Sequence, residues 1–176
     1  MDYTSGIFNL KDYRYNSPDD RTNNTNHHIP STIAKELAHY VVIYAPIQMA
    51  ADLPENYKGH PAFQFILDVP TDWEETQVLN GEIGKYITTV RKDRNSDDWY
   101  LGSITNEEGR KLDVQMSFLE SGKVYNATIY KYPVDGGWEA KPEEIIINNV
   151  QFKKGDQYTI ELPPGGGQAI RFTPQS

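Results

Sequence analysis

KLDVQMSF, residues 111–118, alternates strictly between polar and apolar side chains. Successive side chains of a strand point to opposite faces, so Leu112, Val114, Met116 and Phe118 fall together on one side of an extended segment. The intervening residues are charged or polar and fall on the other side. This pattern favours an antiparallel strand with one face in a core and the other in solvent.

Similar segments recur throughout the C-terminal part of the chain. They are rich in β-branched and aromatic residues and lie at 85–91, 98–105, 111–118, 124–131, 144–152, 157–162 and 167–173. Clusters of Gly, Pro, Asn, Asp and Ser separate them and indicate turns. The sequence therefore predicts a mainly β fold, with an antiparallel β-sandwich of seven to eight strands in residues 71–176, which is long enough to hold its own core.

Residues 1–30 differ in composition: they are polar and rich in turn-forming residues, and they show neither helical nor strand periodicity. A helix is expected to begin at Ser31, its N-cap, and to end at Pro46. Apolar residues cover most of the circumference of this helix. We therefore expect it to need protein on more than one side, with faces around Leu37, Val41 and Tyr44 that this chain leaves uncovered.

The segment that follows the helix is predicted to form short helical pieces separated by a turn. Residues 47–53 favour a second helical piece, residues 55–61 a turn, and residues 62–67 a buried helical turn that stops before Pro70. Helices this short cannot hold a core alone, so a domain boundary is expected near residue 70.

Charge and composition exclude several classes of function. The chain has 176 residues, 17 Lys and Arg against 25 Asp and Glu, and a net charge of -8, which argues against nucleic acid as a partner. The absence of cysteine excludes disulfides, zinc-thiolate sites and thiol nucleophiles. The sequence contains neither a signal peptide nor a membrane-spanning apolar run, so no membrane partner is expected.

No catalytic or metal site is predicted. The acidic pairs at 74–75, 97–98, 107–108 and 143–144 are adjacent residues, whereas glycoside hydrolysis needs two facing carboxylates roughly 5 to 10 Å apart. We interpret them as solvated turn and edge charges. His27 and His28 lack further ligands at a metal-binding spacing.

Trp138 is the candidate for carbohydrate contact. It lies beside two glycines in a loop, where its ring is free to stack on a sugar. Trp99 and Tyr100 are neighbours within a strand, so one is expected in the core and the other outside. A stand-alone carbohydrate-binding module that acts through Trp138 is therefore an alternative function.

Several stretches match the motifs of a known family. The chain opens with Met-Asp-Tyr-Thr-Ser-Gly-Ile-Phe (1–8), continues with IAKELAHYVVIYAPIQMAADLPENY (33–57), and then has PAFQFILDVPTDWEET (61–76), Gly-Glu-Ile-Gly (81–84) and Trp-Tyr-Leu-Gly (99–102). This ordered set resembles the end of the catalytic barrel and the start of the C-terminal β-sandwich in glycoside hydrolase family 97. Its members are α-glucosidases and α-galactosidases of Bacteroides-like bacteria.

The resemblance implies that residues 1–70 are the terminal loop and helix of an incomplete (β/α)8 barrel, and that residues 71–176 are the C-terminal β-sandwich. The implied function is the non-catalytic C-terminal region of an α-glycosidase, which supports the barrel and oligomerisation. The family's acid, base or nucleophile and calcium-binding glutamates lie in earlier parts of the barrel, and no residue here matches them. Glucosidase and galactosidase parentage, and retaining and inverting hydrolysis, all stay open.

The resemblance also implies partners and a location. The partners are the missing barrel portion of the parent enzyme and further copies in a homo-oligomer, with Met1 an internal methionine of a longer protein. Asp2 and Tyr3 would lie near the end of the last barrel strand, where they either contact substrate or shape the loop. No cofactor is expected in this chain, calcium is expected for the intact enzyme, and that enzyme is expected in the periplasm.

Overall fold

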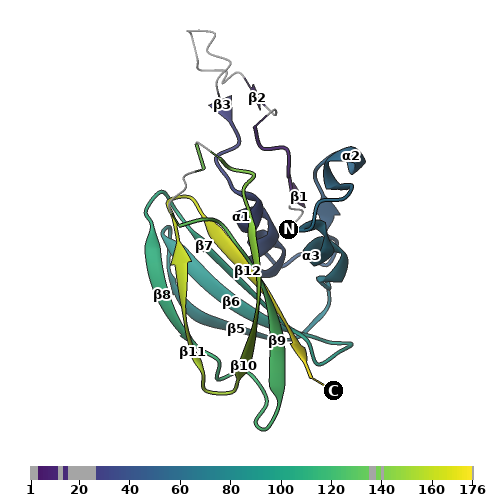
Figure 1. Cartoon of the computed structure of the whole chain (residues 1–176), viewed down its shortest axis with the longest axis vertical. Coiled ribbons are helices and arrows are strands. Elements are labelled where there is room, and N and C mark those ends of the chain that lie inside the picture. Colours follow the sequence, from purple (N-terminus) through teal and green to yellow (C-terminus); the bar gives the residue numbers. More distant parts are fainter. Residues whose placement is uncertain (1–3, 12–13, 16–26, 135–137, 140, 176) are drawn as a thin grey trace.

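The computed structural model describes residues 4–11, 14, 15, 27–134, 138, 139 and 141–175, so Asp2 and Tyr3 lie outside the described part. Most of the chain is a β-rich body, and α1 (Ile33–Val42) lies against one side of it (Figure 1). Two shorter helices, α2 (Pro54–Tyr57) and α3 (Phe63–Asp68), lie beside one end of that body.

A six-stranded antiparallel sheet forms the body. Its strands are, in spatial order, β10 (Ile146–Lys153), β9 (Val124–Lys131), β12 (Gly167–Pro174), β7 (Trp99–Thr105), β6 (Tyr86–Asp93) and β5 (Trp73–Glu82). A second antiparallel pair, β8 (Arg110–Gln115) and β11 (Gln157–Leu162), covers one face. The predicted antiparallel β-sandwich is confirmed.

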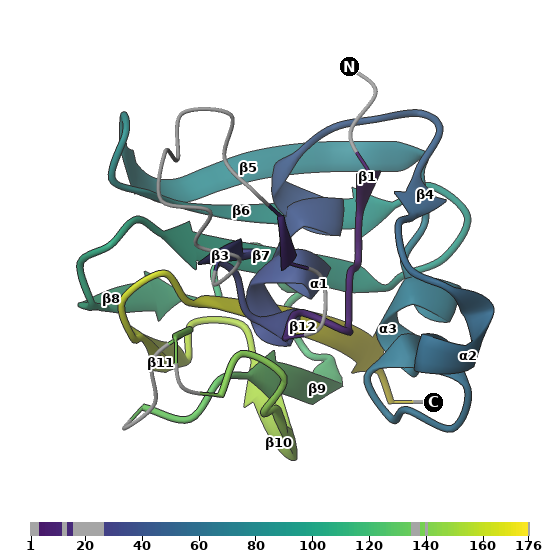
Figure 2. The ribbon, with the colours of Figure 1, turned by 90° about the horizontal axis from the view of Figure 1, so that it is seen from above.

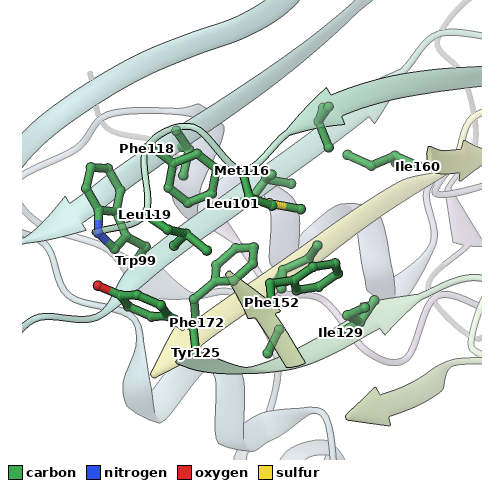
Figure 3. Close-up of a cluster of buried hydrophobic side chains, with 14 of the residues drawn as sticks. Trp99, Leu101, Met116, Phe118, Leu119, Tyr125, Ile129, Phe152, Ile160 and Phe172 are labelled. Carbon is green, nitrogen blue, oxygen red and sulfur yellow. The ribbon is translucent and has the colours of Figure 1, made fainter. Parts of the chain in front are cut away.

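The core between these two sheets is built by the alternation that the sequence displays. Leu112 and Val114 of β8 face inward and meet side chains of the larger sheet such as Leu101 and Phe172. Aromatic rings fill the centre, where the Phe118 and Phe172 rings pack edge to face at 5.5 Å (Figure 3). This sandwich core draws all of its members from residues 79–172.

β5 was not predicted as a separate strand from the sequence, although strand-like periodicity begins at Trp73. It is an edge strand, and apart from buried Trp73 most of its residues are exposed or half-buried. Two irregularities in its pairing with β6, between Trp73 and Glu75 and between Val78 and Asn80, shift the register. Each shift interrupts the period of two on which strand recognition depends.

The expectation that only one of Trp99 and Tyr100 is buried is wrong, since their exposed fractions are 3% and 2%. The two side chains do point to opposite faces of β7. Trp99 enters the sandwich core, whereas Tyr100 enters a second core on the other face of the sheet. β7 is a central strand with both faces covered, so the polar alternation of a half-exposed strand does not apply to it.

The second core lies between the sheet and α1, and glycine makes the close packing possible. A Cβ at Gly102 of β7 would lie 2.6 Å from the carbonyl oxygen of Ala38, and a Cβ at Gly167 of β12 would lie 2.5 Å from the Cα of Lys35. Ala169 pairs with Gly102 across the two strands. α1 lies over β7 and β12 (Figure 2), and these three small residues form the seam on which it packs.

The limits and the coverage of α1 differ from the prediction. Thr32, not Ser31, is the N-cap, because its Oγ1 accepts a hydrogen bond from the amide of Lys35 at 3.2 Å. The expectation of uncovered faces is wrong for Leu37 and Val41, whose side chains are fully buried, whereas Tyr44 is 55% exposed as expected. The sheet covers one side of the helix, and residues 4–10 with α3 cover the other.

The part before residue 70 contains a β-α-β unit. β1 (Thr4–Ser5) pairs in parallel with β4 (Met49–Ala50), and α1 lies between them in sequence. The prediction of a helical piece at 47–53 is therefore wrong, and α2 occupies part of the turn predicted at 55–61. Two-residue strands are too short to produce a periodic signal. β2 (Arg14–Tyr15) and β3 (His27–His28) form a further short antiparallel pair.

We expect Gly102→Ala to lower the free energy of unfolding by about 1–3 kcal/mol, because the added methyl group must push α1 away from the sheet. Gly81→Ala in β5 is the matched control, since its Cβ would meet no atom closer than 3.4 Å. That variant should be neutral or slightly stabilised. Urea denaturation measures both changes, and equal effects of the two substitutions would contradict close packing at Gly102.

Candidate functional site

The carboxyl ends of β1 and β4 lie together because the two strands are parallel, and the chain segments that leave them are joined by Asp52. Asp52 Oδ2 accepts hydrogen bonds from the amides of Phe8 at 2.7 Å and Asn9 at 2.8 Å. Its Oδ1 accepts one from Asn56 Nδ2 at 2.6 Å. One carboxylate thus fixes the segment after β1 against the segment after β4.

Two tyrosine hydroxyls reinforce the same junction. The Tyr40 hydroxyl of α1 lies 3.0 Å from the carbonyl oxygen of Ser5 and 3.1 Å from that of Met49, so it can donate to either strand. The Tyr57 hydroxyl donates to the carbonyl of Gly6 at 2.8 Å. Burial raises the pKa of Tyr40, which keeps its hydroxyl protonated and able to donate.

Glu36 links α1 to the loop that follows β1. It is buried, and its carboxylate accepts hydrogen bonds from the Ser31 hydroxyl at 2.6 Å and from the Gly6 amide at 3.0 Å. Burial raises the pKa of Glu36. Burial, with the charge of Lys35 adding to the effect, lowers the pKa of His39 to about 4, so His39 is neutral at pH 7. Through these contacts the buried carboxylate of Glu36 ties α1 to the loop after β1.

A hollow of about 300 Å³ opens beside this junction. It is lined by Phe8, Asn9, Lys11, Ile33, Asn56, His60 and Glu143. Burial lowers the pKa of His60, and its Nδ1 accepts from the amide of Ala62 at 3.2 Å, so neutral His60 carries its proton on Nε2 as a donor.

The hydrogen-bonding roles of the other polar groups in the hollow are also fixed by their neighbours. Asn56 uses its amide nitrogen on Asp52 and so keeps its carbonyl oxygen as an acceptor. Lys11 and Glu143 form an ion pair at 3.7 Å. Fixed donors and acceptors around an aromatic floor, here Phe8, can take a neutral polyhydroxylated ligand.

The predicted acidic pairs are mostly solvated ion pairs, as in Glu74 with Lys92 at 2.7 Å. Asp98 is the correction: it is buried and bonds to Arg171 Nε at 2.8 Å, and Arg171 also bridges to Asp68. Asp98, directly before β7, is therefore tied to Arg171 of β12 instead of lying in solvent, and Arg171 in turn links β12 to α3. Within the described residues, no group of three or more His, Asp or Glu side chains can hold a metal ion.

Of the predicted carbohydrate contacts, only Trp138 lies in the described part of the chain. It is half-buried, and its ring packs on the turn at Gly165, where a Cβ would lie 2.7 Å from Trp138 Cδ1. Its role in sugar binding stays a prediction. No helix among the described residues has the length and apolar character that crossing a membrane requires.

Residues 72–173 match the family model described as the glycosyl hydrolase 97 C-terminal, oligomerisation domain. The chain belongs to glycoside hydrolase family 97. The resemblance noted in the sequence is thereby confirmed, and the sandwich is the family's C-terminal oligomerisation domain.

Family 97 relatives match this chain over most of its length. A retaining α-galactosidase of Bacteroides thetaiotaomicron is 40% identical over 145 residues, which are 80% of this chain and 21% of that protein. A family 97 enzyme from Pseudoalteromonas sp. strain K8, solved in complex with acarbose, is 41% identical with a TM-score of 0.89 and covers 100% of this chain.

A β-arabinopyranosidase structure is 25% identical over 97% of this chain, with a TM-score of 0.73. Only 26% of the Pseudoalteromonas enzyme and 25% of the arabinopyranosidase are covered. The chain thus spans about a quarter of the length of these enzymes.

The sequence did not predict that Glu36, Tyr40, Asp52 and Tyr57 hold the strand ends. In the sequence, Glu36 belongs to a polar patch of the helix and Tyr40 to one of its apolar stripes, yet both side chains are buried. Asp52 lies two residues before Pro54, a spacing compatible with a carboxylate at the start of a short helix. Their common role depends on contacts up to 51 residues apart, which local patterns do not carry.

The buried neutral state of His39 predicts a pH-dependent stability. The unfolded chain binds a proton to His39 near pH 6.5, whereas the folded chain binds it only near pH 4. The free energy of unfolding should therefore fall by about 2 kcal/mol from pH 7 to pH 5 on account of this residue. The raised pKa of Glu36 acts in the opposite direction, since the folded chain takes up that proton first.

The variant His39→Gln retains Glu36 and isolates the contribution of His39. Its free energy of unfolding, from urea denaturation at several pH values, should depend less on pH by the same amount. Parallel pH profiles for the two proteins would show that His39 titrates normally in the folded chain.

Proposed function

We propose that this chain is the non-catalytic C-terminal region of a larger α-glycosidase, in which residues 1–70 complete a (β/α)8 barrel and residues 71–176 are the C-terminal β-sandwich. The α-galactosidase activity in the name of one relative, and the acarbose bound to another, support an α-linked glycan as the substrate of the whole enzyme. The acid, the base and any calcium ligands then belong to the rest of that enzyme.

The parallel pair of β1 and β4 carries this proposal. Parallel strands joined through a helix are the repeating unit of a (β/α)8 barrel, and a barrel closes only when every strand has two neighbours. Within the described residues, β1 and β4 pair only with each other, so each has one unpaired edge. Unpaired edges and exposed apolar residues around β4, namely Ile47, Met49 and Leu53, fit further barrel strands and helices beside them.

The hollow lined by Asn56 and His60 lies at the carboxyl ends of these strands, where the active sites of barrel enzymes are found. In the proposed enzyme, the network of Asp52, Tyr40 and Tyr57 holds this part of the barrel mouth in place. Asp2, Tyr3 and Trp138 remain proposed contacts to the sugar. The periplasmic location and the calcium requirement of the parent enzyme rest on the family resemblance alone.

The chain alone should not hydrolyse aryl α-galactosides or aryl α-glucosides, with or without calcium, because the family resemblance places the acid and the base or nucleophile in earlier parts of the barrel, and no residue here matches them. A colorimetric assay of the purified chain checks this. Turnover that survives repurification, and that a single carboxylate substitution removes, would contradict the non-catalytic role.

A chimera tests the barrel-completing role directly. The Bacteroides thetaiotaomicron α-galactosidase with its matching C-terminal region replaced by this chain should fold and cleave aryl α-galactosides. Met49→Lys should leave the melting temperature of the isolated chain unchanged, since Met49 is exposed there, and should lower that of the chimera by several degrees. Equal effects in the two proteins would show that nothing covers β4.

A further inference from the structure

The turn between β5 and β6 presents an isoleucine entirely to solvent. Ile83 has an exposed fraction of 102%, and Val78 on the same hairpin has 61%. Large aliphatic side chains gain about 1.5–3 kcal/mol when they are buried, so a contact that covered Ile83 and Val78 would be favourable. This turn lies at the end of the sheet away from α2 and α3 (Figure 2).

A hollow of about 560 Å³ lies beside Ile83. It is lined mainly by apolar groups from three adjacent strands and the turn: Val78, Gly81, Tyr86, Ile87 and Ile104. The projecting Ile83 and this hollow together form a surface that we name the hairpin patch. A projection and a recess side by side on one surface can fit their own copies reciprocally about a two-fold axis.

The charges around the hairpin patch are paired within the chain. Glu82 and Lys85 form an ion pair at 2.6 Å, and Glu108 and Arg110 form one at 2.5 Å. The guanidinium of Arg110 also lies over the ring of Tyr86, 5.2 Å from its centre. Two copies of a chain with net charge -8 repel each other, and a surface whose charges are already neutralised minimises that repulsion at contact.

We propose that the hairpin patch is the surface through which two copies of this chain associate, with Ile83 of each copy entering the hollow of the other. The inference rests on the oligomerisation role of the domain and assigns that role to particular residues. β5 has 10 residues and separates this turn from the start of the sandwich by about 30 Å. Association here therefore leaves the edge of β4 free for the rest of the barrel.

The opposite edge of the sheet provides the competing surface. β10 also exposes apolar side chains, Ile146 and Val150, but polar Asn126, Asn149 and Gln151 line the hollow of about 380 Å³ beside Val150. Buried amides need partners, which makes this edge the poorer site for a hydrophobic contact. Val150 supplies a matched control because it is an exposed aliphatic residue on an edge strand.

Sedimentation velocity of the full chain over a range of concentrations tests the proposal. The chain should form a dimer, and Ile83→Lys should raise the dimer dissociation constant at least tenfold, whereas Val150→Lys should leave it unchanged. Lysine reduces the net negative charge of the chain, so lost association cannot arise from greater overall repulsion. Ile83 is fully exposed, so its variant should keep the thermal stability of the parent.

Cross-linking provides a second readout that does not depend on glycosidase activity. The chain contains no cysteine, so Ile83→Cys and Val150→Cys each introduce a single thiol. A short bismaleimide should link two copies through position 83 and not through position 150. A chain that is monomeric at all concentrations, or one whose association and cross-linking respond at Val150 and not at Ile83, would overturn the proposal.

Discussion

The packing of α1 on the seam of Gly102, Gly167 and Ala169 is the constraint on which the rest of the structure depends. At these positions the helix backbone lies so close to the sheet that no side chain larger than hydrogen fits at either glycine. Polar contacts fix the helix along the seam: Lys35 Nζ donates to the carbonyl of Thr105 at 3.1 Å, and Arg91 Nε donates to that of Val41 at 2.6 Å. Since α1 also lies between β1 and β4 in sequence, this contact joins the β-α-β unit to the β-sandwich.

In the proposed enzyme, this packing gives a rigid connection between the hairpin patch and the barrel mouth. The sheet has two cores, one on each face, so neither the sandwich nor α1 can shift without disturbing packed side chains. From α1, Tyr40 and Glu36 reach the carboxyl ends of the strands, and Asp52 completes the junction. In the proposed enzyme, the oligomerisation domain therefore also acts as a support that keeps one part of the active-site rim in register.

The β-sandwich could be predicted from sequence because its strands are long and alternate, as KLDVQMSF does. The β-α-β unit could not, since β1 and β4 have two residues each and depend on neighbours far along the chain. The prediction that one of Trp99 and Tyr100 faces solvent was wrong because both faces of β7 are covered, so both side chains are buried. The polar junction of Asp52 and Tyr57 could not be predicted from local patterns, because its partners in residues 6–9 are brought close only by the fold. The order of the family motifs, and not the local patterns, indicated that residues 1–70 belong to the end of a barrel.

Native-state hydrogen exchange tests directly whether α1 and the sheet unfold as one cooperative unit. In low concentrations of urea, the amides of Leu37 to Val41 should exchange with the same free energy and the same urea dependence as the amides of β7 and β12. That result would place the helix and the sheet in a single cooperative unit. Exchange of the α1 amides at a clearly lower free energy, through an opening that leaves β7 and β12 protected, would contradict the account.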